Sequence, residues 1–184
     1  MSQDRSTQQD AIQLLTDDQD EVEHMFRQVE AAPEGNVKDQ LVDEIVRELS
    51  VHAVIEEQIL YPAMRTSLPD GDALVEEAIA EHQEAKELLS DIEKSSGIER
   101  EALLRQLMAS IRHHVQEEEG ELFPKLRTAI GASEMQEMGA ALASAKKMAP
   151  TDPHPKAPNQ PPGNVIAGAV ATVMDKARDA LRRD

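Results

Sequence analysis

Apolar residues recur at steps of three and four along four long stretches of this chain, which is the spacing of one face of an α-helix. Aromatic side chains make up only 2% of the residues, so the predicted core is aliphatic and suits packed helices better than sheets. Turn-forming sequences rich in proline, glycine and serine separate the stretches at residues 33–36, 69–71 and 95–97. Four amphipathic helices joined by short turns predict an all-α, up-down-up-down four-helix bundle.

The apolar stripes also place the helices along the chain. The second helix is expected over about residues 37–66, the fourth ends near residue 131, and a shorter fifth helix follows over about 133–147. Pro62 and Pro124 fall late in the second and fourth helices, where each should kink or loosen the final turns.

The composition divides the chain into three parts. Residues 1–148 are expected to form the bundle, and residues 149–164 a proline-rich linker, since 149–163 hold six of the ten prolines. Residues 165–184 read as a C-terminal amphipathic helix with basic residues towards its end. We expect this helix to dock on the bundle or on a second copy of the chain, which would make a homodimer; a helix lying on a membrane surface is the alternative.

Charge and cysteine content exclude several classes of partner. With 36 acidic and 19 basic residues the formal charge is −17, which argues against nucleic acid or an anionic membrane. The chain has no cysteine, hence no disulfide, thiolate nucleophile or thiolate metal site. The polar N-terminal sequence lacks the features of a signal peptide, so the expected location is cytoplasmic.

One block of sequence occurs twice, in the second and fourth helices. It begins at His52 and again at His114, and in both copies a glutamate follows four residues later, at Glu56 and Glu118. These residues interrupt otherwise apolar stripes, and side chains four apart lie one turn apart on the same helix face. Imidazole and carboxylate ligands without thiolate suit iron or manganese, with zinc as an alternative. Two such pairs predict a two-metal site that the glutamates bridge; the alternative is two buried polar pairs that fix helix register.

The first and third helices should supply further ligands. His82 lies on the apolar stripe of the third helix, and the corresponding position of the first helix holds Gln19, where a histidine would fit. Gln19, His24, Glu57 and Tyr61 are further candidates, either as ligands or as residues that contact ligands. Of these, His24 points away from the apolar stripe by the helical period and is expected at the surface.

These blocks, in this order, resemble the hemerythrin-like HHE cation-binding family over about residues 8–130. The resemblance implies a four-helix bundle with a non-haem di-iron centre whose ligands are His52, Glu56, His82, His114 and Glu118. The first-helix motif of the family usually reads Asp-His followed by x-x-Val. Here it reads Asp18-Gln19 before Val22, so one histidine ligand is replaced by glutamine.

The ligand count leaves coordination positions open, which suits dioxygen, nitric oxide or peroxide as ligands. We therefore expect a non-haem iron protein, di-iron or mononuclear, that binds or senses such molecules, for instance in oxidative stress. Two alternatives stay open: a catalase-like di-iron enzyme that consumes peroxide, and a metal-poor structural or stress-response bundle. Whether the chain is an enzyme is not decided by its sequence.

Overall fold

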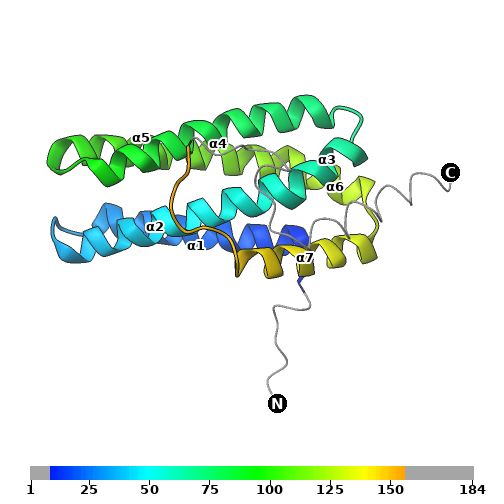
Figure 1. The fold of residues 1–184 in the computed structure, drawn as a ribbon, viewed down its shortest axis with the longest axis horizontal. Coiled ribbons are helices and arrows are strands. Elements are labelled where there is room, and N and C mark those ends of the chain that lie inside the picture. Colours follow the sequence, from blue (N-terminus) through cyan, green and yellow to red (C-terminus); the bar gives the residue numbers. More distant parts are fainter. Residues whose placement is uncertain (1–8, 156–184) are drawn as a thin grey trace, which may run out of the picture.

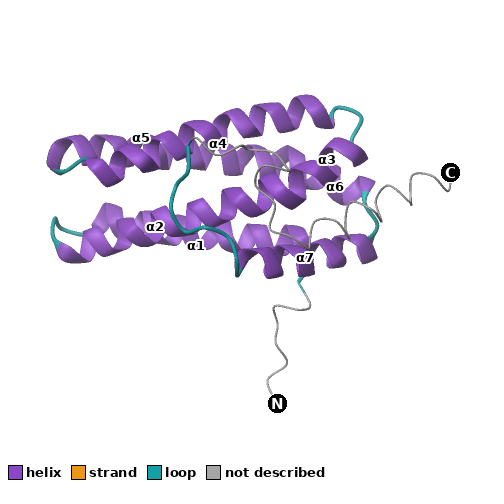
Figure 2. Cartoon of the chain, viewed as in Figure 1, coloured by secondary structure: helices purple, strands orange, loops and turns teal. Residues whose placement is uncertain are grey.

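A computed structural model describes residues 9–155, and four long helical segments run up, down, up and down within it (Figure 1). The second and fourth segments each consist of an α-helix, a π-helical turn and a short α-helix. The elements in chain order are α1 (Ala11–Ala31), α2 (Asn36–Ile55), η2 (Glu56–Leu60), α3 (Tyr61–Ser67), α4 (Gly71–Lys94), α5 (Gly97–Glu117), η3 (Glu118–Leu122), α6 (Phe123–Ala129) and α7 (Ala132–Lys146). The predicted all-α bundle with a short extra helix is confirmed, and residues 9–155 contain no β-strand (Figure 2).

The two predicted weak points in the long segments are π-helical turns. In η2 the backbone N–H of Tyr61 donates to the carbonyl of Glu56, and in η3 that of Phe123 donates to the carbonyl of Glu118. These are bonds between residues five apart, one more than in an α-helix. The second residue after each turn is a proline, Pro62 or Pro124, which has no N–H to continue the regular pattern. The loosening expected from the prolines therefore takes the form of an extra residue in one helical turn. This turn begins at Glu56 in the first block and at Glu118 in the second.

The core consists of two apolar clusters with a polar layer between them. One cluster lies around α3, α6, α7 and the start of α1, and the other around the rest of α1 with α2, α4 and α5. Along α1 the first cluster ends with Leu15 and the second begins with Val22; along α4 the corresponding residues are Ala78 and Ala85. Gln19 and His82 fall in these gaps, so the polar layer crosses the bundle at one level.

The C-terminal part of the described chain lies against the bundle. Helix α7 packs on α1 and α2, and the segment that follows crosses towards α4, where the amide of Gln83 donates to the carbonyl of Pro155 at 3.0 Å (Figure 1). The predicted C-terminal helix over 165–184, and most of the predicted linker, lie outside the described residues. None of the helices within residues 9–155 is long and apolar enough to cross a lipid bilayer.

Candidate metal centre

The polar layer gathers the histidines and glutamates of both repeated blocks with His82. The five side chains are buried, with exposed fractions between 0% and 8%. They are His52, Glu56, His82, His114 and Glu118. Burying this many ionisable groups is costly unless each is paired or binds a cation. The apolar clusters on both sides keep the layer away from bulk water, so the pairing inside it decides its stability.

The five side chains form two ligand groups that share Glu56. In one group, Glu56, His82 and His114 bring their ligand atoms within 4.8 Å of one another; in the other, His52, Glu56 and Glu118 do so. Oε1 of Glu56 lies 3.1 Å from Nε2 of His52, and its Oε2 lies 3.4 Å from Nε2 of His82. One carboxylate thus faces both groups, which is the arrangement of a ligand that bridges two metal ions.

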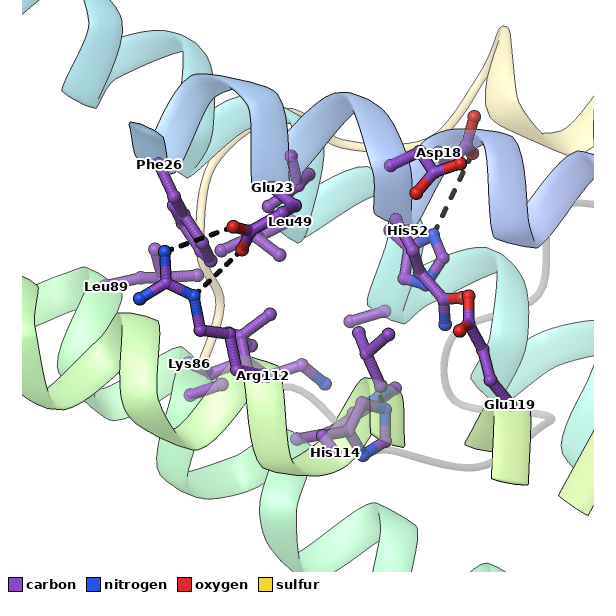
Figure 3. A pocket seen from close by; sticks show the side chains of 18 residues that line it. Asp18, Glu23, Phe26, Leu49, His52, Lys86, Leu89, Arg112, His114 and Glu119 are labelled. Atoms are coloured by element: carbon purple, nitrogen blue, oxygen red, sulfur yellow. Dashed lines mark hydrogen bonds and ion pairs between the residues drawn. The ribbon is translucent and has the colours of Figure 1, made fainter. Parts of the chain in front are cut away.

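A carboxylate lies near the Nδ1 atom of each of the three histidines. The distances are 2.7 Å from Glu81 to His114, 3.1 Å from Glu57 to His82 and 3.8 Å from Asp18 to His52. Figure 3 shows Asp18 facing His52. A carboxylate at Nδ1 fixes the ring orientation and leaves Nε2 available as the ligand atom, a common arrangement around metal-binding histidines.

Two lysines complete the arrangement around the carboxylates. Lys86 Nζ donates to Oε1 of Glu57 at 2.6 Å, and Lys146 Nζ donates to Oδ1 of Asp18 at 2.7 Å. Lys146 comes from α7, so this short extra helix also supports the centre.

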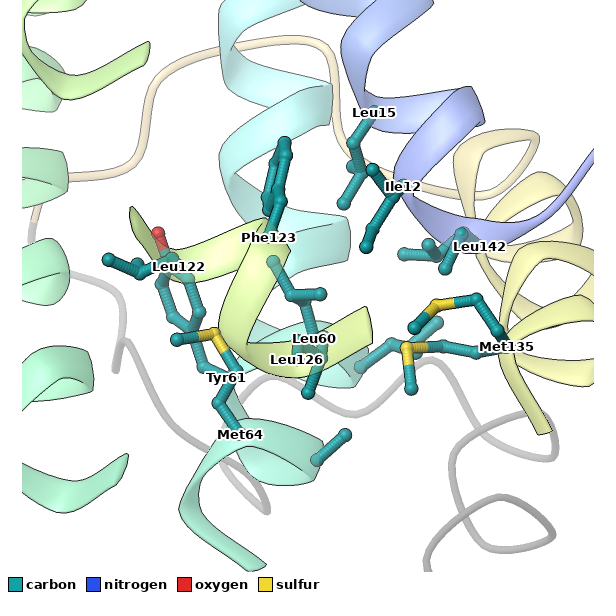
Figure 4. Close-up of a cluster of buried hydrophobic side chains, with 14 of the residues drawn as sticks. Ile12, Leu15, Leu60, Tyr61, Met64, Leu122, Phe123, Leu126, Met135 and Leu142 are labelled. Atoms are coloured by element: carbon teal, nitrogen blue, oxygen red, sulfur yellow. The ribbon is translucent and has the colours of Figure 1, made fainter. Parts of the chain in front are cut away.

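Tyr61 reaches the centre from the first residue of α3, directly after the π-helical turn η2. Its ring packs in the first apolar cluster (Figure 4), and its Oη lies 2.9 Å from Nε2 of His82. Burial and then the charges of Glu56 and Glu118 raise the pKa of the phenol well above its usual value. Tyr61 therefore keeps its proton and presents a hydrogen-bond donor to the ligand side of His82.

Gln19 lies where the predicted first-helix ligand would be. It is buried, and its Nε2 donates to Oε2 of Glu118 at 2.6 Å. His24, in contrast, is exposed and lies 3.1 Å from the amide of Gln28, outside both ligand groups. The structure thus brings Gln19, Glu57 and Tyr61 to the centre and leaves His24 at the surface.

The charges of the cluster act strongly on one another. Burial lowers the pKa of His52, but the carboxylates of Glu56 and Asp18 outweigh burial and raise it to about 10. For His82, burial again lowers the pKa, and the nearby carboxylates of Glu56 and Glu57 raise it to about 9. Burial and the neighbouring Glu56 raise the pKa of Glu118. A metal ion that binds here would therefore displace protons from the imidazoles.

The residues present fit a metal ion. Among the described residues, several buried polar atoms have no hydrogen-bond partner, including both ring nitrogens of His52, both carboxylate oxygens of Glu56, Oε1 of Glu118 and Oε1 of Gln19. Apart from the amide oxygen, these are imidazole and carboxylate atoms, the ligands that iron and manganese take in proteins. A cation between the two glutamates would contact their carboxylate oxygens and Nε2 of His52, and would offset the repulsion between the two carboxylates.

Several residues of the centre are not found by sequence reasoning. Asp18 and Glu81 each precede a site position by one residue, and Lys86 follows His82 by one helical turn, but these spacings are common on any helix. Lys146 has no signal, because it lies 128 residues from its partner. At the surface, Glu81 also forms a more open group with His113 and Glu117 that has ligand-like spacing.

Comparison with known proteins shows the family to which the bundle belongs. A family model described as the hemerythrin HHE cation binding domain matches residues 10–126. An uncharacterized hemerythrin-like protein of Schizosaccharomyces pombe is 30% identical over 161 residues, which cover 86% of this chain and 79% of that protein. A DNA nickase of Nostoc is 28% identical over 140 residues, which cover 75% of this chain but only 38% of the nickase.

A solved structure shares the fold. It is the crystal structure of a hemerythrin HHE cation binding domain-containing protein from Mycobacterium kansasii, with a TM-score of 0.67 and 24% sequence identity, and the match covers 76% of this chain and 86% of that one. The family match spans the four long helical segments up to α6, and with it all five buried histidines and glutamates of the two ligand groups. The chain therefore belongs to the hemerythrin HHE cation-binding domain family.

Proposed function

We propose that this chain is a non-haem iron protein that holds two metal ions and binds dioxygen, nitric oxide or peroxide beside them. The observation that carries the proposal is the pair of buried ligand groups that share Glu56. A buried ion pair needs only its two partners, whereas each of two metal ions needs several ligand atoms, as the two groups provide. Polar pairs that merely fix helix register would also leave fewer buried atoms without a partner.

The two positions differ in their ligands. His82 and His114 would hold one metal ion with Glu56, and His52 would hold the other with Glu56 and Glu118. Gln19 stands beside the second position and can offer only an amide oxygen, which is a weaker ligand for iron than imidazole. We therefore expect the position with two imidazoles to bind metal more tightly than the position with one.

When bound, iron would supply open coordination positions and electrons for reversible binding or reduction of a small oxygen or nitrogen species. The protein contributes the surroundings. The apolar clusters exclude bulk water, and the carboxylates of Asp18, Glu57 and Glu81 hold the imidazoles in orientation. The Tyr61 hydroxyl offers a hydrogen bond at the side of His82.

Metal content together with ligand binding tests the proposal. Protein produced with added iron is expected to carry about two iron ions per chain, and His114→Ala should lose at least one of them. His24→Ala is the matched control, since His24 is an exposed histidine outside the centre. An optical change on addition of nitric oxide to the reduced protein should appear in the control and weaken in His114→Ala. Iron content near zero in the unmodified protein would favour the metal-poor structural bundle instead.

A second candidate function is peroxide consumption, and the position of Tyr61 favours it. Conversion of two peroxide molecules to dioxygen and two water molecules requires proton transfer between oxygen atoms, and the buried phenol, which keeps its proton, can hold and orient a peroxide at this point by a hydrogen bond. Tyr61→Phe removes the hydroxyl and keeps the ring. If the chain is such an enzyme, oxygen release from peroxide should fall in Tyr61→Phe while iron content is unchanged. Absence of turnover by fully loaded protein would remove this candidate.

DNA nicking, the activity in the name of the Nostoc relative, is not proposed for this chain. This chain matches 38% of that nickase, so the activity named there belongs to a protein with much sequence that has no counterpart here. The formal charge of −17 also disfavours contact with a phosphate backbone.

A further inference from the structure

An apolar cavity adjoins the candidate metal centre inside the bundle. It has a volume of about 220 Å³ and lies between α1, α2, α4 and α5 (Figure 3). His52, His82 and His114 of the candidate metal centre are among its lining residues. Most of its wall is apolar and comes from the second core cluster, chiefly Val22, Phe26, Leu49, Ala85, Leu89 and Ile111.

The size of the cavity exceeds what a diatomic ligand or peroxide needs. A dry apolar cavity of about 150 Å³ in another protein accommodates benzene. A volume of about 220 Å³ therefore has room for an organic molecule of roughly six to ten carbon atoms. Packed protein interiors have few voids this large, because each forfeits contacts between its lining side chains.

The charges around the cavity decide which organic molecules fit. The arginine and the lysine of its lining are already paired: Arg112 with Glu23 at 2.8 Å and Glu30 at 3.0 Å, and Lys86 with Glu57 at 2.6 Å. The imidazoles of His52 and His82 likewise lie 3.1 Å from the carboxylates of Glu56 and Glu57. Two further acidic residues, Asp20 and Glu119, also line it and are exposed. An anionic ligand would meet the carboxylates of Asp20 and Glu119 and cations that are already paired, whereas an uncharged apolar molecule would lose little on leaving water.

The outer part of the cavity lies beside a side-chain contact between two helices. The guanidinium of Arg112 on α5 bonds to Glu23 on α1 and lies 5.7 Å from the ring centroid of Phe26 (Figure 3). Arg112 is 41% exposed and its partner Glu23 is 29% exposed, so this pair lies at the surface. It can open by side-chain rotation without disturbing the backbone of either helix.

We propose that this cavity binds a compact, uncharged, apolar organic molecule, of aromatic or aliphatic type, against the imidazoles of the metal centre. Such a ligand would lie beside the open coordination positions, as an organic substrate or as an effector that controls the access of smaller molecules. The binding itself depends on the cavity and not on the metal, so it is distinct from the proposed function.

Fluorobenzene is a suitable probe, with its fluorine resonance followed by NMR during titration into the metal-free full chain. Saturable binding is expected. Ala85→Leu places three additional carbon atoms in the cavity and should weaken binding by about tenfold or more. Ala143→Leu is the matched control, because Ala143 is partly buried against the other core cluster on α7, away from the cavity, and should bind like the unmodified chain. Fluorobenzoate, of similar size but anionic, should bind at least about tenfold more weakly.

A second measurement keeps the test decisive if Ala85→Leu fails to fold. In protein loaded with Mn²⁺, the fluorine resonance of bound fluorobenzene should broaden strongly relative to protein loaded with Zn²⁺, because histidines of the centre line the cavity. Absence of saturable binding, equal binding by Ala85→Leu, or equally tight fluorobenzoate would overturn the proposal. Saturable binding to a chain that takes up no metal would support the cavity and remove only the proposed function.

Discussion

The amide nitrogen of Gln19 lies 2.6 Å from Oε2 of Glu118 and joins α1 to the π-helical turn of the fourth helical segment. The bond occupies one oxygen of a carboxylate that belongs to the second ligand group, while the amide oxygen of Gln19 has no hydrogen-bond partner among the described residues. An imidazole at position 19 would instead offer a ring nitrogen to a metal ion at that place. The identity of this one residue therefore sets the difference between the two proposed metal positions.

Replacing Gln19 by His should tighten the weaker of the two metal positions. The substitution adds an imidazole ligand and frees Oε2 of Glu118, so we expect the affinity of that position to rise by about tenfold or more. Competition titration with a coloured chelator would measure both affinities. The control is Gln13→His, which adds a histidine to an exposed position of the same helix. Equal affinities in the two variants would contradict the role given to position 19.

A residue of this centre can be predicted from the sequence only where the pattern around it gives a signal. His52, Glu56, His114 and Glu118 are found from sequence because they interrupt apolar stripes at helical spacing, and burial makes such interruptions rare. The π-helical turns are only half predictable, since Pro62 indicates that the helix must loosen without saying how.

Other features depend on contacts between distant parts of the chain. Lys146 contacts Asp18 across 128 residues, and a lysine in the last turn of a helix gives no sign of such a partner in the sequence. The apolar cavity exists because the side chains of four helices do not fill the space between them, and the apolar stripes of the sequence do not indicate this.

The buried pair of Lys86 and Glu57 should be sensitive to the loss of one partner. Both side chains are almost fully buried, with exposed fractions of 6% and 0%, and removing the lysine leaves the buried carboxylate of Glu57 beside the imidazole of His82 without its ammonium partner. Lys86→Met is expected to lower the free energy of unfolding of the metal-free protein by about 3–5 kcal/mol. The double variant Lys86→Met with Glu57→Gln should recover part of this loss, because no unpaired charge remains. Urea unfolding would measure the values, and a double variant less stable than Lys86→Met would argue against an ionised pair.

Gly139 should resist enlargement because α7 contacts the start of α1 at this residue. A Cβ atom there would lie 2.8 Å from the carbonyl carbon of Asp10, and backbone cannot move aside as a side chain can. Gly139→Ala is expected to destabilise the protein by about 1–3 kcal/mol despite the better helix propensity of alanine. The comparison is Gly120→Ala, where an added Cβ meets nothing within 4 Å and should stabilise by about 0.5–1 kcal/mol. Thermal unfolding of both variants checks the prediction, and a stable Gly139→Ala protein would mean that α7 is not fixed at this contact.

The pairing of Asp10 with Arg127 should make part of the stability depend on pH. Asp10 caps α1 by accepting a hydrogen bond from the backbone N–H of Gln13, and Arg127 of α6 donates to its carboxylate at 2.9 Å. Burial raises the pKa of Asp10, but the bonds from Arg127 and Gln13 outweigh burial and hold it below 3.8. A lowered pKa in the folded state gives stability that is present above the unfolded value and is lost as pH falls through the folded value.

Asp10→Asn isolates this charge, because asparagine caps helices about as well as aspartate. At about pH 6 the variant should be less stable by about 1 kcal/mol or less, as expected for a partly exposed ion pair. The difference in unfolding free energy between the two proteins should shrink below about pH 4, where the aspartate takes up its proton. Urea unfolding of both proteins across this range provides the measurement, and their difference removes the effect of the other acidic groups. A difference that stays constant with pH would show that Asp10 acts as a helix cap alone.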